Sequence, residues 1–500
     1  MHEDFDRCYR AVQSKDVRFD GWFVTAVRTT GIYCRPSCPA PLPRARNVTF
    51  LPSAAAAQRA GYRPCKRCRP DAAPGSPQWS VRDDVVARAM RLIADGVIER
   101  DGVDGLAARL GYTARHVQRL LQTEVGAGPL SLARAQRTQT ARVLIESTTL
   151  PLSEIAFAAG FSSIRQFNDT LRDVCRASPG ELRRRGIGRA CGAPGGAGGL
   201  WLRLAVRPPF AYAGVFGHLG AGAVPGCEEV RDGAFRRTLR LPHGTGVVAL
   251  TPAPDHVGCR LELEDFRDLG AAIARCRRLL DLDADPEAIS AALCEDPALA
   301  SLVAAAPGQR IPRTVDEAEL AVRVVLGQQV SMKAARTHTA RLVTRYGRPV
   351  ADPGGALTHT FPTVAELAGI ADADLALPRA RRRTVRAVLA ALASGALVLD
   401  PGCDWDRARH RLRALPGVGP WSTEVIAMRA LGDPDAFPVT DLGVRTAARG
   451  RGLPVDSAAL SAHSRRWRPW RAYAAQQLWA GLDHEVTTWP PTESAAKESA

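Results

Sequence analysis

Four cysteines near the amino terminus have the residue type and spacing that bind a metal ion. Cys34 and Cys38 form one close pair, and Cys65 and Cys68 form another. Two such pairs suit one tetrahedral Zn²⁺, which takes four sulfur ligands in many structural sites. Most zinc sites of this kind only fold a small domain, so the spacing alone favours a structural role.

Basic side chains surround these cysteines, which changes the chemistry that the site could perform. Zinc supplies two positive charges and four thiolates supply four negative ones, so the site is an anion with electron-rich sulfurs. A nucleophile of this kind beside a basic surface lies next to the place where a polyanion would bind. The flanking cations are Arg35, Arg44, Arg46, Arg63, Lys66, Arg67 and Arg69.

The text around the cysteines resembles a known module. VTAVRTTGIYCRPSC (24–38) and GYRPCKRC (61–68) are similar to the N-terminal module of the bacterial adaptive-response regulator Ada. The resemblance implies that the zinc-bound thiolate of Cys34 takes a methyl group from a methylated DNA phosphate. We expect Arg35 and Arg67 to contact that DNA, because Arg suits phosphate recognition.

The composition favours a nucleic-acid partner and no membrane. The 500-residue chain has a formal net charge of +16, and 46% of its residues are hydrophobic, enough for ordinary cores. No apolar run approaches the length of a membrane span, and the opening MHEDFDRCYR lacks the apolar stretch of a signal peptide. We therefore expect a cytosolic protein, in which the clustered cysteines are metal ligands rather than disulfides.

The middle of the chain carries one helical pattern twice. VDGLAARLGYTARHVQRLL (103–121) and LSEIAFAAGFSSIRQFNDTL (152–171) each contain a helix, a turn at glycine and a second helix, and a helix at 129–147 joins them. This is the helix-turn-helix pattern, whose second helix enters the major groove.

The pair resembles the DNA-binding domain of the AraC family of transcription activators. About half of the polar residues on the recognition helices should touch bases and the rest phosphate or solvent. The candidates are Arg115, His116 and Arg119 on the first helix, and Ser163, Arg165, Gln166 and Asn168 on the second.

The C-terminal half contains a hairpin followed by an acidic residue. LRALPGVGPWSTEVIAMRALG (412–432) predicts two helices joined by a PGVG turn, where Gly417 and Gly419 let backbone N–H groups approach a phosphate. Asp441 follows in FPVTDLGVR. An acidic residue at such a place is most often a helix N-cap, and the sequence alone favours that role.

Three segments together resemble the inducible 3-methyladenine glycosylase II of bacteria, the AlkA type. They are the hairpin with its downstream Asp, VRVVLGQQVSMKAA (322–335) and RPWRAYAAQQLW (468–479). The resemblance implies that Asp441 stabilises a cationic sugar and assists attack by water, while Trp421 and Trp479 line the base pocket. It also implies a monovalent cation on backbone carbonyls of the hairpin.

Two positions depart from the AlkA-type pattern, and a third decides the reaction type. Val425 replaces a tyrosine of the best-known relatives, which predicts a wider pocket, and Gln329 stands at the wedge position that enters the vacated base stack. Bifunctional relatives carry a catalytic lysine where this chain has Trp421. The resemblance therefore implies a monofunctional glycosylase, which leaves the abasic strand uncut.

The sequence predicts a multidomain, mainly α-helical protein. We expect a small four-cysteine zinc α+β module in residues 1–76 and a tandem helix-turn-helix domain in 80–186. A glycine-rich linker at 187–199 precedes a small antiparallel β-sheet subdomain in 200–305. An all-α helix-hairpin-helix glycosylase domain occupies 306–490.

These resemblances imply an alkylation-damage response protein that accepts methyl groups, activates transcription when methylated and excises 3-methyladenine-type purines. The expected cofactors are one Zn²⁺ and the hairpin cation. The expected partners are alkylated DNA, promoter DNA and RNA polymerase, with the protein a monomer. Two alternatives stay open: a DNA-binding regulator with a catalytically degenerate glycosylase half, and a glycosylase that its N-terminal modules only localise on DNA.

Overall fold

The computed structural model describes residues 2–16, 19–68, 70, 85–148, 150–186, 199–253, 256–352, 354–482 and 489. The chain forms two compact units. The first comprises Met1–Arg207, Leu241–Gly244 and Arg260–Ala274, and the second comprises Pro208–Arg240, Thr245–Cys259 and Arg275–Ala500. Apart from residue 199, the linker predicted at 187–199 lies outside the described residues.

A small four-stranded sheet carries the four cysteines. Its order is β3-β1-β2-β4, and β2 pairs with β4 in parallel, with Tyr33 opposite Pro64. Because parallel strands end on the same side, the residues at their carboxyl ends, Cys34 and Cys65, come together. The elements are α1 (Phe5–Gln13), β1 (Val24–Val27), β2 (Ile32–Cys34), β3 (Val48–Leu51), α2 (Ala54–Arg59) and β4 (Arg63–Pro64).

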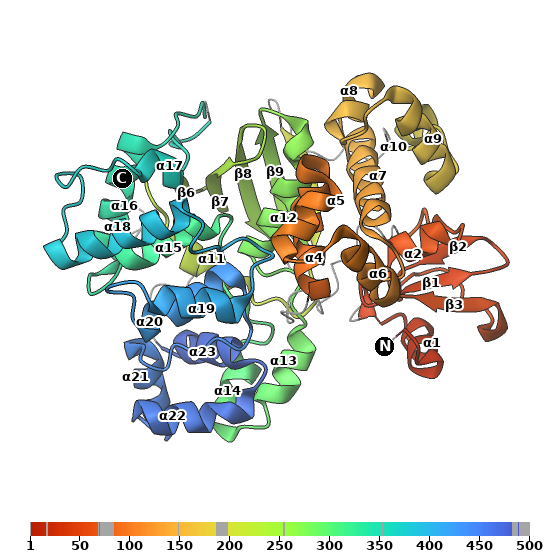
Figure 1. The fold of residues 1–500 in the computed structure, drawn as a ribbon. Coiled ribbons are helices and arrows are strands. Elements are labelled where there is room, and N and C mark those ends of the chain that lie inside the picture. Colours follow the sequence, from red (N-terminus) through yellow and green to blue (C-terminus); the bar gives the residue numbers. More distant parts are fainter. Residues whose placement is uncertain are drawn as a thin grey trace. The chain divides into compact units, whose positions relative to one another are not determined.

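The two helices of this module cover opposite faces of its sheet (Figure 1). Cys8 and Val12 of α1 pack with Phe50 of β3 in one apolar cluster. Ala57 of α2 packs with Tyr33 in another. The predicted α+β module is confirmed, and its small core leaves the cysteine loops at one end of the sheet.

The two helix-turn-helix motifs form as predicted, with α7 (Pro129–Ser147) between them. Gly111 and Gly160 end the first helix of each motif with φ values of 79° and 81°, in the left-handed region that glycine adopts without strain. The other helices are α4 (Val85–Ala94), α5 (Val97–Leu110), α6 (Ala114–Glu124), α8 (Leu152–Ala158), α9 (Ile164–Cys175) and α10 (Pro179–Gly186).

A five-stranded sheet of order β5-β9-β8-β7-β6 follows. The ladders of β6 with β7 and of β7 with β8 are antiparallel, which confirms the predicted small antiparallel β-sheet. Strand β6 has the sequence EEVR, in which no alternation of apolar residues indicates a strand. The elements are β5 (Leu200–Ala205), α11 (Tyr212–Ala221), β6 (Glu228–Arg231), β7 (Ala234–Arg240), β8 (Thr245–Pro252) and β9 (His256–Leu263).

The rest of the second unit is helical and shares one large apolar core, which includes Leu326, Ile426 and Trp467. Among the described residues, no helix has both the length and the apolar character needed to cross a membrane. The helices are α12 (Leu269–Leu279), α13 (Pro286–Leu293), α14 (Pro297–Ala305), α15 (Glu317–Leu326), α16 (Met332–Tyr346), α17 (Val364–Leu367), α18 (Arg379–Ala393), α19 (Trp405–Arg413), α20 (Pro420–Ile426), the π-helical turn η6 (Ala427–Leu431), α21 (Leu442–Gly450), α22 (Ser457–His463) and α23 (Arg471–Ala480).

A closed square of buried charges joins the sheet to α15. Arg237 donates to Glu228 at 2.9 Å and to Glu319 at 2.8 Å, and Arg323 donates to the same two carboxylates at 2.9 Å each. Burial opposes ionisation of Glu228, yet Arg323 and Arg237 bring its pKa below the ordinary value. The square is neutral as a whole, so removing one member leaves an uncompensated buried charge.

We expect Arg237→Met to lower the free energy of unfolding by about 3–5 kcal/mol at pH 7, because two carboxylates then share one arginine. Arg386→Leu, which breaks a more exposed pair with Asp372, is the control and should cost at most about 1 kcal/mol. Since the pKa of Glu228 is lowered by folding, its contribution is present above pH 4.5 and is lost as the pH falls further. Equal losses in the two variants would contradict the assignment.

Candidate functional site

The four cysteines form one cluster. Their Sγ atoms all lie within 4.8 Å of one another, so one ion can reach all four. Four thiols without a carboxylate or imidazole are the donor set that zinc prefers. Cys34 is half-buried, whereas Cys38, Cys65 and Cys68 are buried. Cys34 is therefore the sulfur that a molecule arriving from solvent can reach most easily.

A buried carboxylate that the sequence did not reveal fixes the loop between Cys34 and Cys38. Asp20 is fully buried and accepts from the backbone N–H of Ser37 at 3.0 Å and from its hydroxyl at 2.6 Å. Arg35 lies 3.3 Å from the same carboxylate, so part of its charge is directed inward. Arg67 is exposed and remains available for phosphate.

We expect the purified protein to hold close to one zinc ion per chain and to lose it in Cys38→Ala. The reason is that four thiolates converge on one point and that structural zinc contributes directly to folding. Elemental analysis is the measurement, and Cys294→Ala, which removes an exposed thiol outside the cluster, is the control. Metal-free wild type from a zinc-supplemented preparation would contradict the assignment.

The recognition helices present some of the predicted residues to solvent and use others as caps. Arg115 and Arg119 are exposed on α6, and His116 is half-buried and stacks on Tyr112 with ring centroids 4.8 Å apart. Their contact with bases stays a prediction.

In the second motif, two residues that are predicted to contact bases, Ser163 and Gln166, stabilise the start of α9. The Ser163 hydroxyl accepts from the backbone N–H of Gln166 at 3.1 Å, and the Gln166 side chain accepts from the Ser162 hydroxyl at 3.0 Å. Arg165 is exposed and lies 3.8 Å from Asp169, while Asn168 is half-buried. Capping is thus one role of Ser163 and Gln166.

The hairpin between α19 and α20 leaves an open backbone surface. Gly417 has a φ of 79°, and a Cβ there would collide with the Thr384 hydroxyl, so no other residue fits without movement. Gly419 caps α20 without a side-chain hydrogen bond, and nothing lies within 4 Å of an added Cβ. The backbone at Gly419, at the start of α20, is therefore open to close approach by a ligand.

Gln328, for which the sequence gives no signal of its own, connects the loop between α15 and α16 to the hairpin. Its amide donates to the backbone carbonyl of Gly417 at 3.1 Å and to the Ser422 hydroxyl at 2.8 Å. The neighbouring Gln329 is exposed, with a φ of 55° that non-glycine residues rarely adopt. Its side-chain oxygen accepts a hydrogen bond from Arg381 at 3.4 Å.

Asp441 is an N-cap and also the centre of a polar cluster. Its Oδ1 accepts from the backbone N–H of Val444 at 2.9 Å and from the indole of Trp479 at 2.8 Å. The indole of Trp421 donates to Oδ2 at 2.8 Å. An ionised carboxylate has about four acceptor positions, so one remains free. Asp441 is thus the N-cap that its sequence context predicts, and three donors fix its carboxylate in place. Its catalytic role stays a prediction.

A cavity of about 450 Å³ opens beside this carboxylate. Asp441, Trp421, Trp479 and Val425 line it, so the structure brings the predicted catalytic and pocket residues together. Gly443 also lines it, and a Cβ there would lie 3.0 Å from Trp479 and 3.1 Å from the Asp441 carboxylate. The small residue next to Asp441 therefore leaves room for the Trp479 indole.

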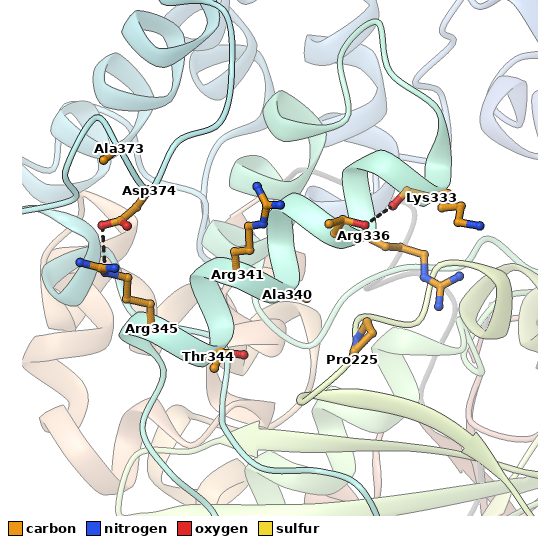
Figure 2. Close-up of a pocket in the computed structure, with 10 residues that line it drawn as sticks. Pro225, Lys333, Arg336, Ala340, Arg341, Thr344, Arg345, Ala373 and Asp374 are labelled. Carbon is orange, nitrogen blue, oxygen red and sulfur yellow. Dashed lines mark hydrogen bonds and ion pairs between the residues drawn. The ribbon is translucent and has the colours of Figure 1, made fainter. Parts of the chain in front are cut away.

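A second hollow, of about 750 Å³, follows the exposed side of α16 (Figure 2). Arg341 and Lys333 are exposed there, and Arg345 pairs with Asp374 at 3.0 Å. α16 begins directly after the loop that carries Gln329, so this basic surface lies next to that loop.

Three family models match parts of the chain. The metal binding domain of Ada matches residues 7–71, a helix-turn-helix domain matches 106–185, and the AlkA N-terminal domain matches 201–316. These matches fall on the cysteine module, the two helix-turn-helix motifs and the five-stranded sheet.

Curated relatives match in the same arrangement. The chain is 69% identical to the probable bifunctional transcriptional activator/DNA repair enzyme AlkA of Mycobacterium tuberculosis, over 99% of this chain and 100% of that protein. It is 30% identical to DNA-3-methyladenine glycosylase 2 of Escherichia coli, over 58% of this chain and 98% of that protein. It is 34% identical to the Escherichia coli bifunctional activator and repair enzyme Ada, over 33% of this chain and 46% of that protein.

Proposed function

Because the chain belongs to the family of bifunctional transcriptional activators and DNA repair enzymes of the AlkA type, we propose that it joins three activities on alkylated DNA. It excises alkylated purines, accepts methyl groups from DNA phosphates and activates transcription once methylated. The observation that carries the proposal is the carboxylate of Asp441, held by two indoles at a base-sized cavity beside the hairpin.

Excision begins with extrusion of the damaged nucleotide, while the hairpin N–H groups hold the backbone and Gln329 fills the gap. Alkylation at N3 or N7 makes the purine cationic, so it is already a good leaving group, and the indoles of the cavity favour a cationic ring. The free acceptor position of Asp441 faces the sugar as positive charge develops, and orients the attacking water. The product is a free base and an uncut abasic strand.

Methyl transfer uses Cys34. The thiolate attacks the methyl carbon of a phosphotriester, an S–C bond forms, and the C–O bond breaks with its electron pair left on the phosphate. Bound zinc would keep the four sulfurs deprotonated. Because the Cys34 thiolate becomes a neutral thioether, the zinc site carries one negative charge less. This reduces its repulsion from DNA phosphates and strengthens promoter binding.

The remaining assignments extend the same proposal. The two recognition helices would place the protein on promoter DNA, with Arg115, Arg119 and Arg165 exposed for contact, and RNA polymerase would be the partner in activation. The protein would act as a monomer. The family resemblance also supports a monovalent cation on the backbone carbonyls of the hairpin.

One preparation tests both reactions. The full chain is incubated with duplex DNA that contains methylphosphotriesters and 7-methylguanine. We expect peptide mass spectrometry to find methyl on Cys34 and chromatography to find free 7-methylguanine. Methyl on Cys38 instead, or no methyl on any of the four cysteines, would refute the acceptor assignment. Absence of free base would refute the glycosylase.

The basic surface along α16 predicts a salt-dependent contribution to DNA binding. Each phosphate contact contributes a slope of about 0.9 in the dependence of log K on log salt. We expect Lys333→Ser and Arg341→Ser each to reduce the slope by about that amount, measured by fluorescence anisotropy on undamaged duplex DNA. Arg231→Ser, an exposed arginine on β6 beside Asp232, is the control. Slopes that match wild type in both α16 variants would contradict the prediction.

A further inference from the structure

Two polar residues that the proposed reaction does not use lie in the wall of the cavity beside Asp441. His218 belongs to α11, and Arg429 belongs to the π-helical turn η6, which continues the hairpin helix α20. Turns of π-helix occur mostly as single insertions and are frequent at functional sites. This turn is followed by Gly432, whose φ is 76°.

The contact between these two side chains fixes the state of the imidazole. Arg429 Nη1 lies within hydrogen-bonding distance of His218 Nε2. A guanidinium can only donate, so Nε2 must accept and the single proton of the neutral ring is on Nδ1. No group within the described residues accepts from Nδ1, and the ring is only half-buried. The Nδ1–H group is therefore left for a ligand.

Arg429 is itself held by the catalytic cluster. Its guanidinium carbon lies 5.3 Å from the centre of the Trp479 ring, a cation–π distance. The indole N–H of Trp479 donates to Asp441 at 2.8 Å. His218, Arg429, Trp479 and Asp441 therefore form one continuous line of contacts along the cavity wall.

The charges around the pair keep this arrangement at neutral pH. Burial holds the pKa of His218 well below its ordinary value, and the nearby cations Arg429 and Arg323 add to the effect. Burial lowers the pKa of Arg429 to about 10, against the opposing attraction of Asp441, so the guanidinium stays charged. Glu228 and Arg237 of the wall belong to the neutral buried square, and Arg313 and Arg336 also line the cavity, as further cations that oppose protonation of the imidazole.

We propose that Arg429 locks His218 in its Nδ1–H form, and that His218 then donates a hydrogen bond to a lone pair of the extruded base. His218 is thus a specificity-determining residue, and Arg429 is a positioning residue that acts through it. The inference rests on the proposed glycosylase function and names its ligand more closely. The base must turn a ring nitrogen or a carbonyl oxygen toward this wall. An amino group at that place would bring a second hydrogen-bond donor against the Nδ1–H group of His218.

Substitution of single atoms in the base tests the hydrogen bond. Single-turnover excision is measured on duplexes with hypoxanthine and with analogues that each lack one acceptor: O6, N3 or N7. We expect His218→Phe to slow excision of hypoxanthine about tenfold or more, the equivalent of one hydrogen bond. On the one analogue that lacks the accepting atom, wild type and His218→Phe should react at the same rate.

Two further variants complete the test. His218→Asn should recover part of the rate, because its amide can donate from nearly the same place as Nδ1, and His256→Phe on β9 is the control. A loss in His218→Phe that is equal on every analogue would overturn the inference while leaving the glycosylase intact. A wild type that releases neither hypoxanthine nor 7-methylguanine would refute the proposed function itself.

The role of Arg429 has its own spectroscopic readout. Nitrogen NMR of the histidine-labelled full chain, assigned with His218→Asn, reports which ring nitrogen carries the proton. We expect Nδ1–H in wild type and loss of that preference in Arg429→Leu. Protonation on Nε2 in wild type would overturn the proposal whatever the excision rates are.

Discussion

Asp441→Asn is expected to slow base excision by about 10²–10⁴-fold, the range that a positioned catalytic acid or base contributes. The reason is electrostatic: the amide is neutral and cannot stabilise the developing cation of the sugar. The helix should keep its cap, since Asn serves as well as Asp at this position. The measurement is the single-turnover release of 7-methylguanine, with duplex affinity recorded in parallel.

A matched control separates catalysis from capping. Asp456 is the N-cap of α22 and accepts from the backbone N–H of Ala459 at 2.9 Å, as Asp441 does from Val444. Asp456→Asn therefore makes the same chemical change at the same helical position, and Asp456 does not line the cavity. We expect both helices to keep their N-cap and excision to slow in Asp441→Asn alone. Some loss of thermal stability is also expected in Asp441→Asn, because its amide nitrogen cannot accept from an indole N–H. Wild-type rates in Asp441→Asn would remove the carboxylate from the mechanism.

Cys34→Ala is expected to abolish methyl uptake from methylphosphotriester DNA, because the only partly accessible sulfur of the cluster is gone. Labelled methyl from the DNA, counted on the protein after digestion, measures the transfer. Cys294→Ala, which removes an exposed thiol with no metal partner, should retain full uptake. Transfer to another cysteine of the cluster in Cys34→Ala would show that the sulfurs are interchangeable.

The same protein tests the charge switch. We expect methylated wild type to bind promoter DNA more tightly than unmethylated wild type, with a difference that shrinks as salt is added. Cys34→Ala should show no change after the same treatment. Equal affinities of methylated and unmethylated wild type at low salt would contradict the switch but not the transfer.

The sequence predicts correctly those elements whose determining residues lie within one short segment. The paired cysteines, the glycine turns at Gly111 and Gly160 and the helix at 129–147 all lie within short segments, and the structure confirms them. Asp441 illustrates the limit, because its sequence context predicts a cap and gives no sign of the indoles that reach it. Trp421 lies 20 positions before Asp441, whereas Trp479 lies 38 positions after it, on α23.

What the sequence could not give depends on contacts between distant segments. Asp20 supports the cysteine loop from outside the metal motif, and Gln328 reaches the hairpin across 89 positions. His218 and Arg429 are separated by 211 positions, and neither has a motif of its own. The π-helical turn that carries Arg429 reads as ordinary helix in the sequence, since one extra residue in a turn leaves no pattern.

The product of the wild-type reaction shows whether the protein excises an alkylated base by hydrolysis alone. Duplex DNA with a single 7-methylguanine is incubated with the full chain, in the presence and absence of borohydride, and the base, the strand and the protein are analysed together. We predict free 7-methylguanine, an intact abasic strand and no trapped adduct, because the family resemblance places Trp421 where a Schiff-base lysine would act. Strand cleavage with a borohydride-trapped protein–DNA adduct, or a duplex left unchanged, would contradict it.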